Sequence, residues 1–326
     1  RSLVNRIWQY HFGQGIAGNA SNFGVMGKKP THPELLDWLT NYFIEHGWSF
    51  KEMHRLMMTS DTYMRASTHP DAKEVNEIDP NNHYLAYFTP RRLTAEELRD
   101  AMLAVSGELN TEMGGLPIKP EINREVAMQP RHIMGSIAPA YQPSRTPEER
   151  NRRTIYSYHY RGLPNPMLEV FNQPNSDLSC EQRIASTVTP QVFTLFNGQN
   201  SYNRALAMAQ RLEQEETEIK RNIERAMELA WNRPAEGEEV QASADFVAKM
   251  VEYHQENDPV DPEYPVEIQR TMFEEMTGEE FSYTERLDVY ENYVDDVAPS
   301  EVSPETRALA DLCRVLFNAN EFVYVY

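Results

Sequence analysis

Residues 31–60 read THPELLDWLTNYFIEHGWSFKEMHRLMMTS and predict two helices joined by a very short turn. Thr31 and Glu34 have the spacing of a capping box, and an apolar stripe at helical spacing follows them. Gly47 supplies the residue type that commonly ends a helix, and Ser49 with Glu52 repeats the capping pattern at once. This stretch therefore predicts a helical hairpin.

Similar signals recur along the chain and favour a mainly α-helical fold. Helices are expected from Thr94 to a stop near Gly107, as two consecutive segments over 200–231, over 238–254, and from Pro304 through Leu316. Residues 255–303, which are acidic and punctuated by proline, are expected to form a helical insertion.

The middle of the chain has a different composition. Residues 116–190 hold ten of the 21 prolines, too many for long helices. Residues 153–160, RTIYSYHY, are the best strand candidate because β-branched and aromatic side chains crowd them, so a small β element is expected near 150–161. We expect a single integrated unit over 1–326, comprising an N-terminal helical part (1–115), a proline-rich central part (116–199) and an acidic helical C-terminal part (200–326).

The charge is unevenly distributed. The net charge is −19, and residues 211–326 carry all of it, with 29 acidic and 10 basic side chains. Nucleic acid is an unsuitable partner because phosphate binding requires a basic surface. No apolar run reaches the roughly 18 residues needed for a transmembrane helix. Because the chain begins with Arg1 inside a helical pattern, we interpret it as a fragment of a longer polypeptide.

The cluster most typical of a functional site consists of Arg153, Tyr156, His159 and Arg161. Arginine can bind carboxylate, sulfate or phosphate groups, and tyrosine rings can stack on sugars. These side chains could equally serve internal ion pairs and packing. Three carboxylates are candidate acids or bases for an enzyme that uses this cluster: Glu34, Asp37 and Asp100.

The cysteines and histidines carry little further signal. Cys180 and Cys313 are a candidate disulfide if the protein is exported, but they could also be free thiols. No C-x-x-C-H motif is present, so c-type haem cannot be attached covalently to this segment. The nine histidines lack the spacing of a metal site, and none is predicted.

Ordered sequence blocks over most of the chain are shared with one family. The chain resembles the planctomycete-type, cytochrome-associated domain of unknown function 1553 (PSD type). The blocks are Val4–Gln9 with Phe12-Gly13, Phe23-Gly24, Pro30–Leu39, Gly47-Trp48, Ser60–Tyr63, Arg91–Glu96 with Arg99–Ala101, Arg152-Arg153 with Tyr156, Ser179-Cys180 with Arg183, Thr189–Gln191, Asn232–Pro234, Asp311–Asn318 and Glu321–Val325.

The resemblance implies an exported, extracytoplasmic bacterial protein. Its partners would be other domains of the same polypeptide, including c-type cytochrome modules that carry haem, while this segment holds no cofactor. The expected function is an interaction or scaffolding module linked to polysaccharide use. The alternative is an enzyme that acts on an anionic, for example sulfated, glycan through Arg153, Tyr156, His159 and Arg161. The family supplies no catalytic residues to transfer.

Overall fold

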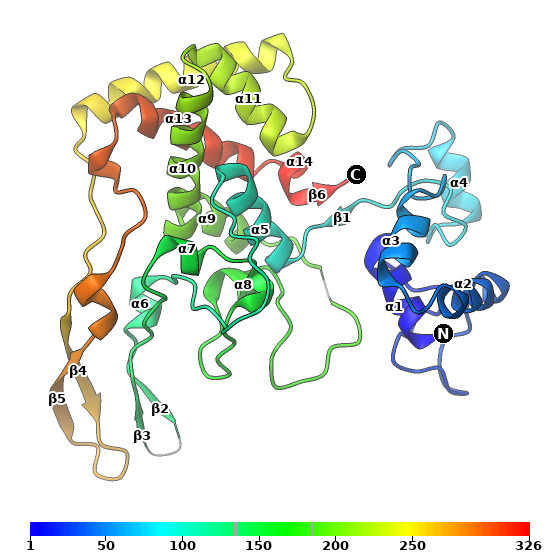
Figure 1. The fold of residues 1–326 in the computed structure, drawn as a ribbon, viewed down its shortest axis with the longest axis horizontal. Helices are drawn as coiled ribbons and strands as arrows, with labels where there is room; N and C mark the ends of the chain where they lie inside the picture. The colour runs from blue at the N-terminus through cyan, green and yellow to red at the C-terminus, as the bar shows by residue number, and fades with distance from the viewer. Residues whose placement is uncertain (134–135, 184) are drawn as a thin grey trace. The chain divides into compact units, whose positions relative to one another are not determined.

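The computed structural model describes residues 1–133, 136–183 and 185–326, and it confirms a mainly α-helical fold with small β elements (Figure 1). The chain divides into two compact units. Unit 1 contains Arg1–Arg92, the described part of Ser179–Ile184, and Tyr324–Tyr326, and unit 2 contains Leu93–Leu178 and Ala185–Val323. The first boundary between the units follows Arg92, within the N-terminal part (1–115) expected from the sequence.

Unit 1 is built on the predicted helical hairpin. The hairpin helices are α2 (Pro33–Glu45) and α3 (Phe50–Met58), and both pack against α1 (Ser2–Phe12). The apolar faces of the three helices and Ile16 from the loop after α1 form one core: Val4, Ile7, Trp8, Phe12, Ile16, Leu36, Leu39, Phe43, Met53 and Met57. Unit 1 also contains α4 (Ala72–Ile78) and the short antiparallel pair β1 (Arg91–Arg92) and β6 (Tyr324–Val325).

The caps of the hairpin helices agree only partly with the prediction. Ser49 caps α3 by accepting a hydrogen bond from the Glu52 N–H. The predicted Thr31–Glu34 capping box is wrong, because His32 is the N-cap of α2 and no side chain caps that helix. The Thr31 hydroxyl instead donates to the Ile16 carbonyl at 3.3 Å, which joins the loop after α1 to the start of α2.

Unit 2 contains the helices predicted from Thr94 to Gly107, over 200–231, over 238–254 and from Pro304. The capping box of Thr94 and Glu97 is present, and Gly107 ends the first helix with a φ of 82°. Helix α13 packs against both α10 and α12 (Figure 1). The helices of this unit are α5 (Ala95–Ser106), α6 (Arg124–Ala127), α7 (Pro147–Arg150), α8 (Pro166–Val170), α9 (Thr189–Asn197), α10 (Gln199–Glu215), α11 (Ile219–Trp231), α12 (Gly237–Glu256), α13 (Pro304–Phe317) and α14 (Asn320–Val323).

The paired strands of unit 2 lie outside 150–161, where the expected small β element consists of isolated bridges at Arg152, Ser157 and Tyr160. The described residues of this unit form two antiparallel pairs, β2 (Arg131–Ile133) with β3 (Ser136–Ala138), and β4 (Glu267–Phe273) with β5 (Glu280–Arg286). The predicted strand over 153–160 is wrong, since a 3-10 turn occupies Thr154–Tyr156 and isolated bridges flank it. The predicted helical insertion over 255–303 is also wrong, because this stretch contains the β4–β5 hairpin and the 3-10 turns Asp288–Asn292 and Pro299–Glu301.

Within the described part of the chain, we find no helix whose length and apolar character suit a membrane span.

Candidate functional site

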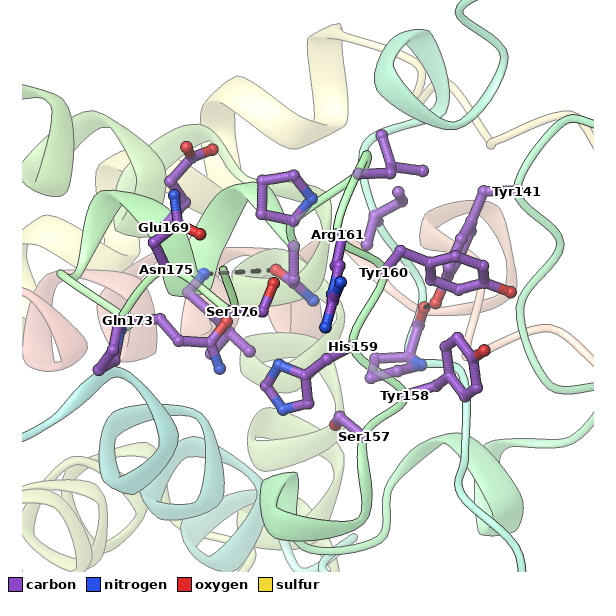
Figure 2. Close-up of a pocket in the computed structure, with 17 residues that line it drawn as sticks. Tyr141, Ser157, Tyr158, His159, Tyr160, Arg161, Glu169, Gln173, Asn175 and Ser176 are labelled. Carbon is purple, nitrogen blue, oxygen red and sulfur yellow. Dashed lines mark hydrogen bonds between the residues drawn. The ribbon is translucent and has the colours of Figure 1, made fainter. Parts of the chain in front are cut away.

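A pocket in unit 2 lies beside residues 157–161, the second half of the cluster predicted from the sequence (Figure 2). The backbone of this segment is fixed by two hydrogen bonds to Ile118, whose N–H donates to Tyr156 and whose carbonyl accepts from Tyr158, both at 2.8 Å. Asn165 also lines the pocket. Its side chain is held in place because its Oδ1 accepts hydrogen bonds from the first N–H groups of α8. The resulting cavity has a volume of about 110 Å³.

Polar and aromatic side chains surround this pocket. His159 and Arg161 come from the predicted cluster, and Tyr158 and Tyr160 stand beside them with ring centroids 4.5 Å apart. Another side of the pocket is lined by one polar residue of α8 and by polar residues of the segment that follows this helix (Figure 2). These residues are Glu169, Gln173, Asn175 and Ser176.

Arg161 is the strongest cation at this pocket. Its side chain is 79 % exposed, and its Nε lies 3.4 Å from Oδ1 of Asp177, a carboxylate that is itself exposed. Such a solvated ion pair contributes little to stability, because water and salt screen both charges. The guanidinium is therefore available to a ligand that offers a better-placed anion.

Tyr141 and Tyr160 form the rigid back of the pocket. Their ring centroids are 5.6 Å apart in an edge-to-face arrangement, and the Tyr141 hydroxyl donates to the Pro120 carbonyl at 2.6 Å. Burial raises the pKa of Tyr141, so this phenol stays protonated and acts as a fixed donor. Glu169 is the carboxylate found among the residues that line this pocket.

The other half of the predicted cluster lies outside the pocket and is structural. The Arg153 Nε is 3.7 Å from Oδ2 of Asp100. The Tyr156 hydroxyl accepts a hydrogen bond from the Gly114 N–H, and the Arg152 guanidinium lies 4.3 Å from the centre of its ring. The structure thus separates Arg153 and Tyr156 from His159 and Arg161.

The three carboxylates that are candidate acids or bases also lie away from the pocket of Figure 2. Asp100 Oδ1 accepts hydrogen bonds from both the N–H and the hydroxyl of Thr154, at 2.7 and 2.6 Å, and so holds the 3-10 turn. Glu34 and Asp37 belong to α2 in unit 1, where Asp37 accepts a hydrogen bond from Arg1 at 2.7 Å. None of the three lines the pocket of Figure 2.

Cys180 and Cys313 are free thiols in the structure. Cys313 is enclosed in the apolar core on α13 in unit 2, whereas Cys180 is exposed and belongs to unit 1. Burial raises the pKa of the Cys313 thiol, which makes it a poor nucleophile.

The sequence did not reveal that several arginines are buried in the core of unit 2. Arg99 is fully enclosed and donates to the carbonyls of Arg150 and Arg152, at 2.7 and 3.1 Å. Burial lowers the pKa of Arg99 to about 10, so it remains charged at neutral pH. These hydrogen bonds fix the backbone that leads into the 3-10 turn.

Arg204 is the second centre of this buried network. Its Nη2 lies 2.9 Å from Asp296 Oδ1, and its Nε lies 3.1 Å from Glu108 Oε2. Burial opposes ionisation of Asp296, but the guanidinium groups of Arg204 and Arg150 outweigh it and lower the pKa of that carboxyl. Burial raises the pKa of Glu108, with Arg204 opposing the shift. These buried arginines therefore stabilise the core of unit 2 through hydrogen bonds and ion pairs.

The described residues contain no group of three or more histidine, cysteine, aspartate or glutamate side chains able to hold a metal ion.

Comparison with known proteins identifies a match to a family model. A family model described as "PSD1: Protein of unknown function (DUF1553)" matches residues 1–247. No curated protein matches the chain, and no solved structure does. The matched range includes all residues that line the pocket of Figure 2.

Proposed function

The chain belongs to the PSD1 (DUF1553) family of proteins of unknown function, and from the pocket of Figure 2 we propose that it is a binding module for anionic glycans. In this proposal, Arg161 and His159 hold a sulfate or carboxylate substituent. Tyr158 and Tyr160 contact the sugar ring, and the amides of Gln173 and Asn175 bind its hydroxyl groups. The observation that carries the proposal is the exposed Arg161 beside two tyrosines at a hollow surface.

The size of the pocket supports binding of a substituent rather than of a whole oligosaccharide. Its volume of about 110 Å³ is below the roughly 300–1,000 Å³ of typical small-molecule sites. A single charged group with part of one ring is therefore the portion of a glycan that suits it. The rest of the polymer would extend into solvent.

The charges and carboxylates around the pocket favour binding over hydrolysis. The pocket is formed by residues 120–176, which lie in the part of the chain with no net charge, so the acidic C-terminal part does not dominate it. A typical glycoside hydrolase uses two carboxylates that flank the scissile bond. Glu169 is the carboxylate that the described lining supplies, which supports a non-catalytic role.

The proposal extends to the setting of the module. We place it outside the cytoplasm, in an exported bacterial protein of planctomycete type that takes part in polysaccharide use. Its partners would be other domains of the same polypeptide, including c-type cytochrome modules. The sequence given contains no C-x-x-C-H motif for covalent attachment of c-type haem. The haem would therefore be carried by those other modules.

Binding of a sulfated oligosaccharide and of its desulfated counterpart, measured by isothermal titration calorimetry, tests this proposal. We expect the sulfated form to bind more tightly, and added salt to weaken it. Arg161→Gln should lower the affinity about tenfold to a hundredfold, since a charge-assisted hydrogen bond contributes about 1.5–3 kcal/mol. Arg153→Gln is the matched control, because it removes the same charge outside the pocket, and it should change the affinity less than twofold.

Three results would contradict the proposal. Equal affinity for the sulfated and desulfated oligosaccharides would show that the protein does not recognise the anionic group. Unchanged affinity in Arg161→Gln would show that the ligand binds elsewhere. Release of new reducing ends or of free sulfate during incubation would establish an enzyme in place of a binding module.

A further inference from the structure

A second cavity in unit 2 lies around Glu121 and Tyr264 and is not part of the pocket of Figure 2. Its volume is about 250 Å³. Tyr141, Tyr264 and Tyr290 contribute aromatic walls, and Glu121 contributes a partly buried carboxylate. These residues come from distant parts of the chain, and the segment after α12 supplies two of the three tyrosines.

The Glu121 carboxylate is poorly compensated by its surroundings. Its Oε1 accepts a hydrogen bond from the Tyr264 hydroxyl at 3.1 Å. Burial raises the pKa of Glu121, and the negative charge of Asp296 adds to this effect, while Arg150 opposes it. A positive charge placed in the cavity would favour the ionised carboxylate directly.

The tyrosines are suited to the same kind of charge. Tyr264, Tyr290 and Tyr293 form one aromatic cluster, with ring centroids 4.7 to 5.4 Å apart. The Arg150 guanidinium already lies 4.4 Å from the centre of the Tyr293 ring, so this cluster supports a cation on one of its faces. Aromatic faces attract cations, and most strongly where water is excluded.

The exposed residues that line the cavity also favour a cationic ligand. Glu125, Glu263 and Arg124 are among them, which gives more acidic than basic groups. Arg124 is paired with Glu263, with Nη1 and Oε2 3.8 Å apart. A hard metal ion needs several oxygen ligands, about six to eight for Ca²⁺, whereas an ammonium group needs one carboxylate and aromatic faces.

We propose that this cavity binds a small organic cation, an ammonium compound whose charge is held by Glu121 and by the rings of Tyr264 and Tyr290. This cavity shares Ile122 and Tyr141 with the lining of the pocket of Figure 2, but other residues hold the charge of its ligand, and that charge is the opposite one. The two proposals can therefore fail independently.

Choline is the probe, and 3,3-dimethyl-1-butanol is its neutral counterpart of the same shape. We expect choline to bind, as measured by calorimetry and by the change in tyrosine fluorescence, and the neutral compound to bind at least tenfold more weakly. Glu121→Gln should lower the choline affinity at least tenfold, because the amide can still accept from Tyr264 but carries no charge. Glu263→Gln, at the exposed mouth, is the control and should lower it less than threefold.

The proposal is overturned if choline does not bind, if the neutral compound binds equally well, or if Glu121→Gln leaves the affinity unchanged. The circular dichroism spectrum and the midpoint of thermal unfolding of Glu121→Gln check that it is folded. If that variant does not fold, the comparison of choline with 3,3-dimethyl-1-butanol on the unaltered protein decides the question.

Discussion

Replacing Arg204 by methionine tests the structural use of the buried arginines most directly. The side chain is 1 % exposed, and its guanidinium lies between Asp296 and Glu108. Methionine retains much of the packing volume and removes the charge. The two carboxylates then lose their closest cation within a region of low polarity.

The expected loss of stability can be worked out from these contacts. Removing one partner of a buried ion pair costs about 3–5 kcal/mol. Asp296 keeps two other partners, the amide of Asn203 at 3.0 Å and Arg150 at 3.6 Å, so we expect the lower end, about 3 kcal/mol. For a unit of this size, 1 kcal/mol shifts the midpoint of thermal unfolding by about 2–4 °C, which gives a shift of roughly 6–12 °C.

The loss should also depend on pH. Arg204 now lowers the pKa of Asp296 and opposes the raised pKa of Glu108, so both pKa values rise when it is removed. Carboxyl groups whose folded pKa lies above the unfolded value bind more protons in the folded state, so acidification favours folding of the variant. The difference in stability between the variant and the unaltered protein should therefore shrink from pH 7 to pH 5.

Urea unfolding followed by circular dichroism measures these differences. Arg153→Met is the matched control, because its side chain is 52 % exposed and its contact with Asp100 is 3.7 Å, and it should cost less than about 1 kcal/mol. Adding Asp296→Asn to Arg204→Met should recover part of the loss. A loss below about 1 kcal/mol in Arg204→Met at pH 7 would refute the view that this ion pair matters to the core.

Three further measurements follow from other features. Without reductant, a thiol reagent should label Cys180 in the folded protein and Cys313 only after denaturation, and failure to label both after denaturation would indicate a bridge. Gly107→Ala should cost about 1–2 kcal/mol in urea unfolding because φ is 82° there, and an unchanged midpoint would contradict this. Hydrogen bonds from Arg233 lower the pKa of Glu239 from 4.5 to about 2. Glu239→Gln should therefore reduce stability at pH 7, with the difference disappearing as the pH falls towards 2, and a constant difference would exclude this ion pair as its cause.

The helices were predictable because their signals are local. Thr94 with Glu97 and Gly107 mark the two ends of α5, and the structure contains both the capping box and the left-handed glycine. Ser303 likewise caps α13. Capping and hydrophobic periodicity involve residues within a few positions of one another, so a sequence displays them directly.

The errors arose where distant residues decide the conformation. Residues 153–160 have the composition of a strand, but Asp100 accepts hydrogen bonds from the N–H and the hydroxyl of Thr154 and stabilises a turn there. In the acidic stretch after α12, many glutamates occupy the β4–β5 hairpin. They make the alternation of polar and apolar residues typical of strands difficult to recognise. The buried Arg270 fixes this hairpin by donating to the carbonyls of Gln129 and Ala138, far away in the sequence.

The candidate site was only partly predictable for the same reason. The sequence predicts the cluster as one centre, whereas the structure places His159 and Arg161 at a pocket and Arg153 beside Asp100. Glu121 and Tyr264 are 143 residues apart and share no motif. A sequence shows which side chains can carry charge, but it does not show which of them are buried.

The path of the chain through the two units has a practical consequence for dissecting the protein. The chain leaves unit 1 after Arg92, re-enters it at Ser179 and returns to it at Tyr324, so no single cut yields the units as separate pieces. Trimming Tyr324–Tyr326 would remove β6, the strand partner of β1. A tag or truncation at the C-terminus thus acts on the unit that is formed mainly by the first ninety residues.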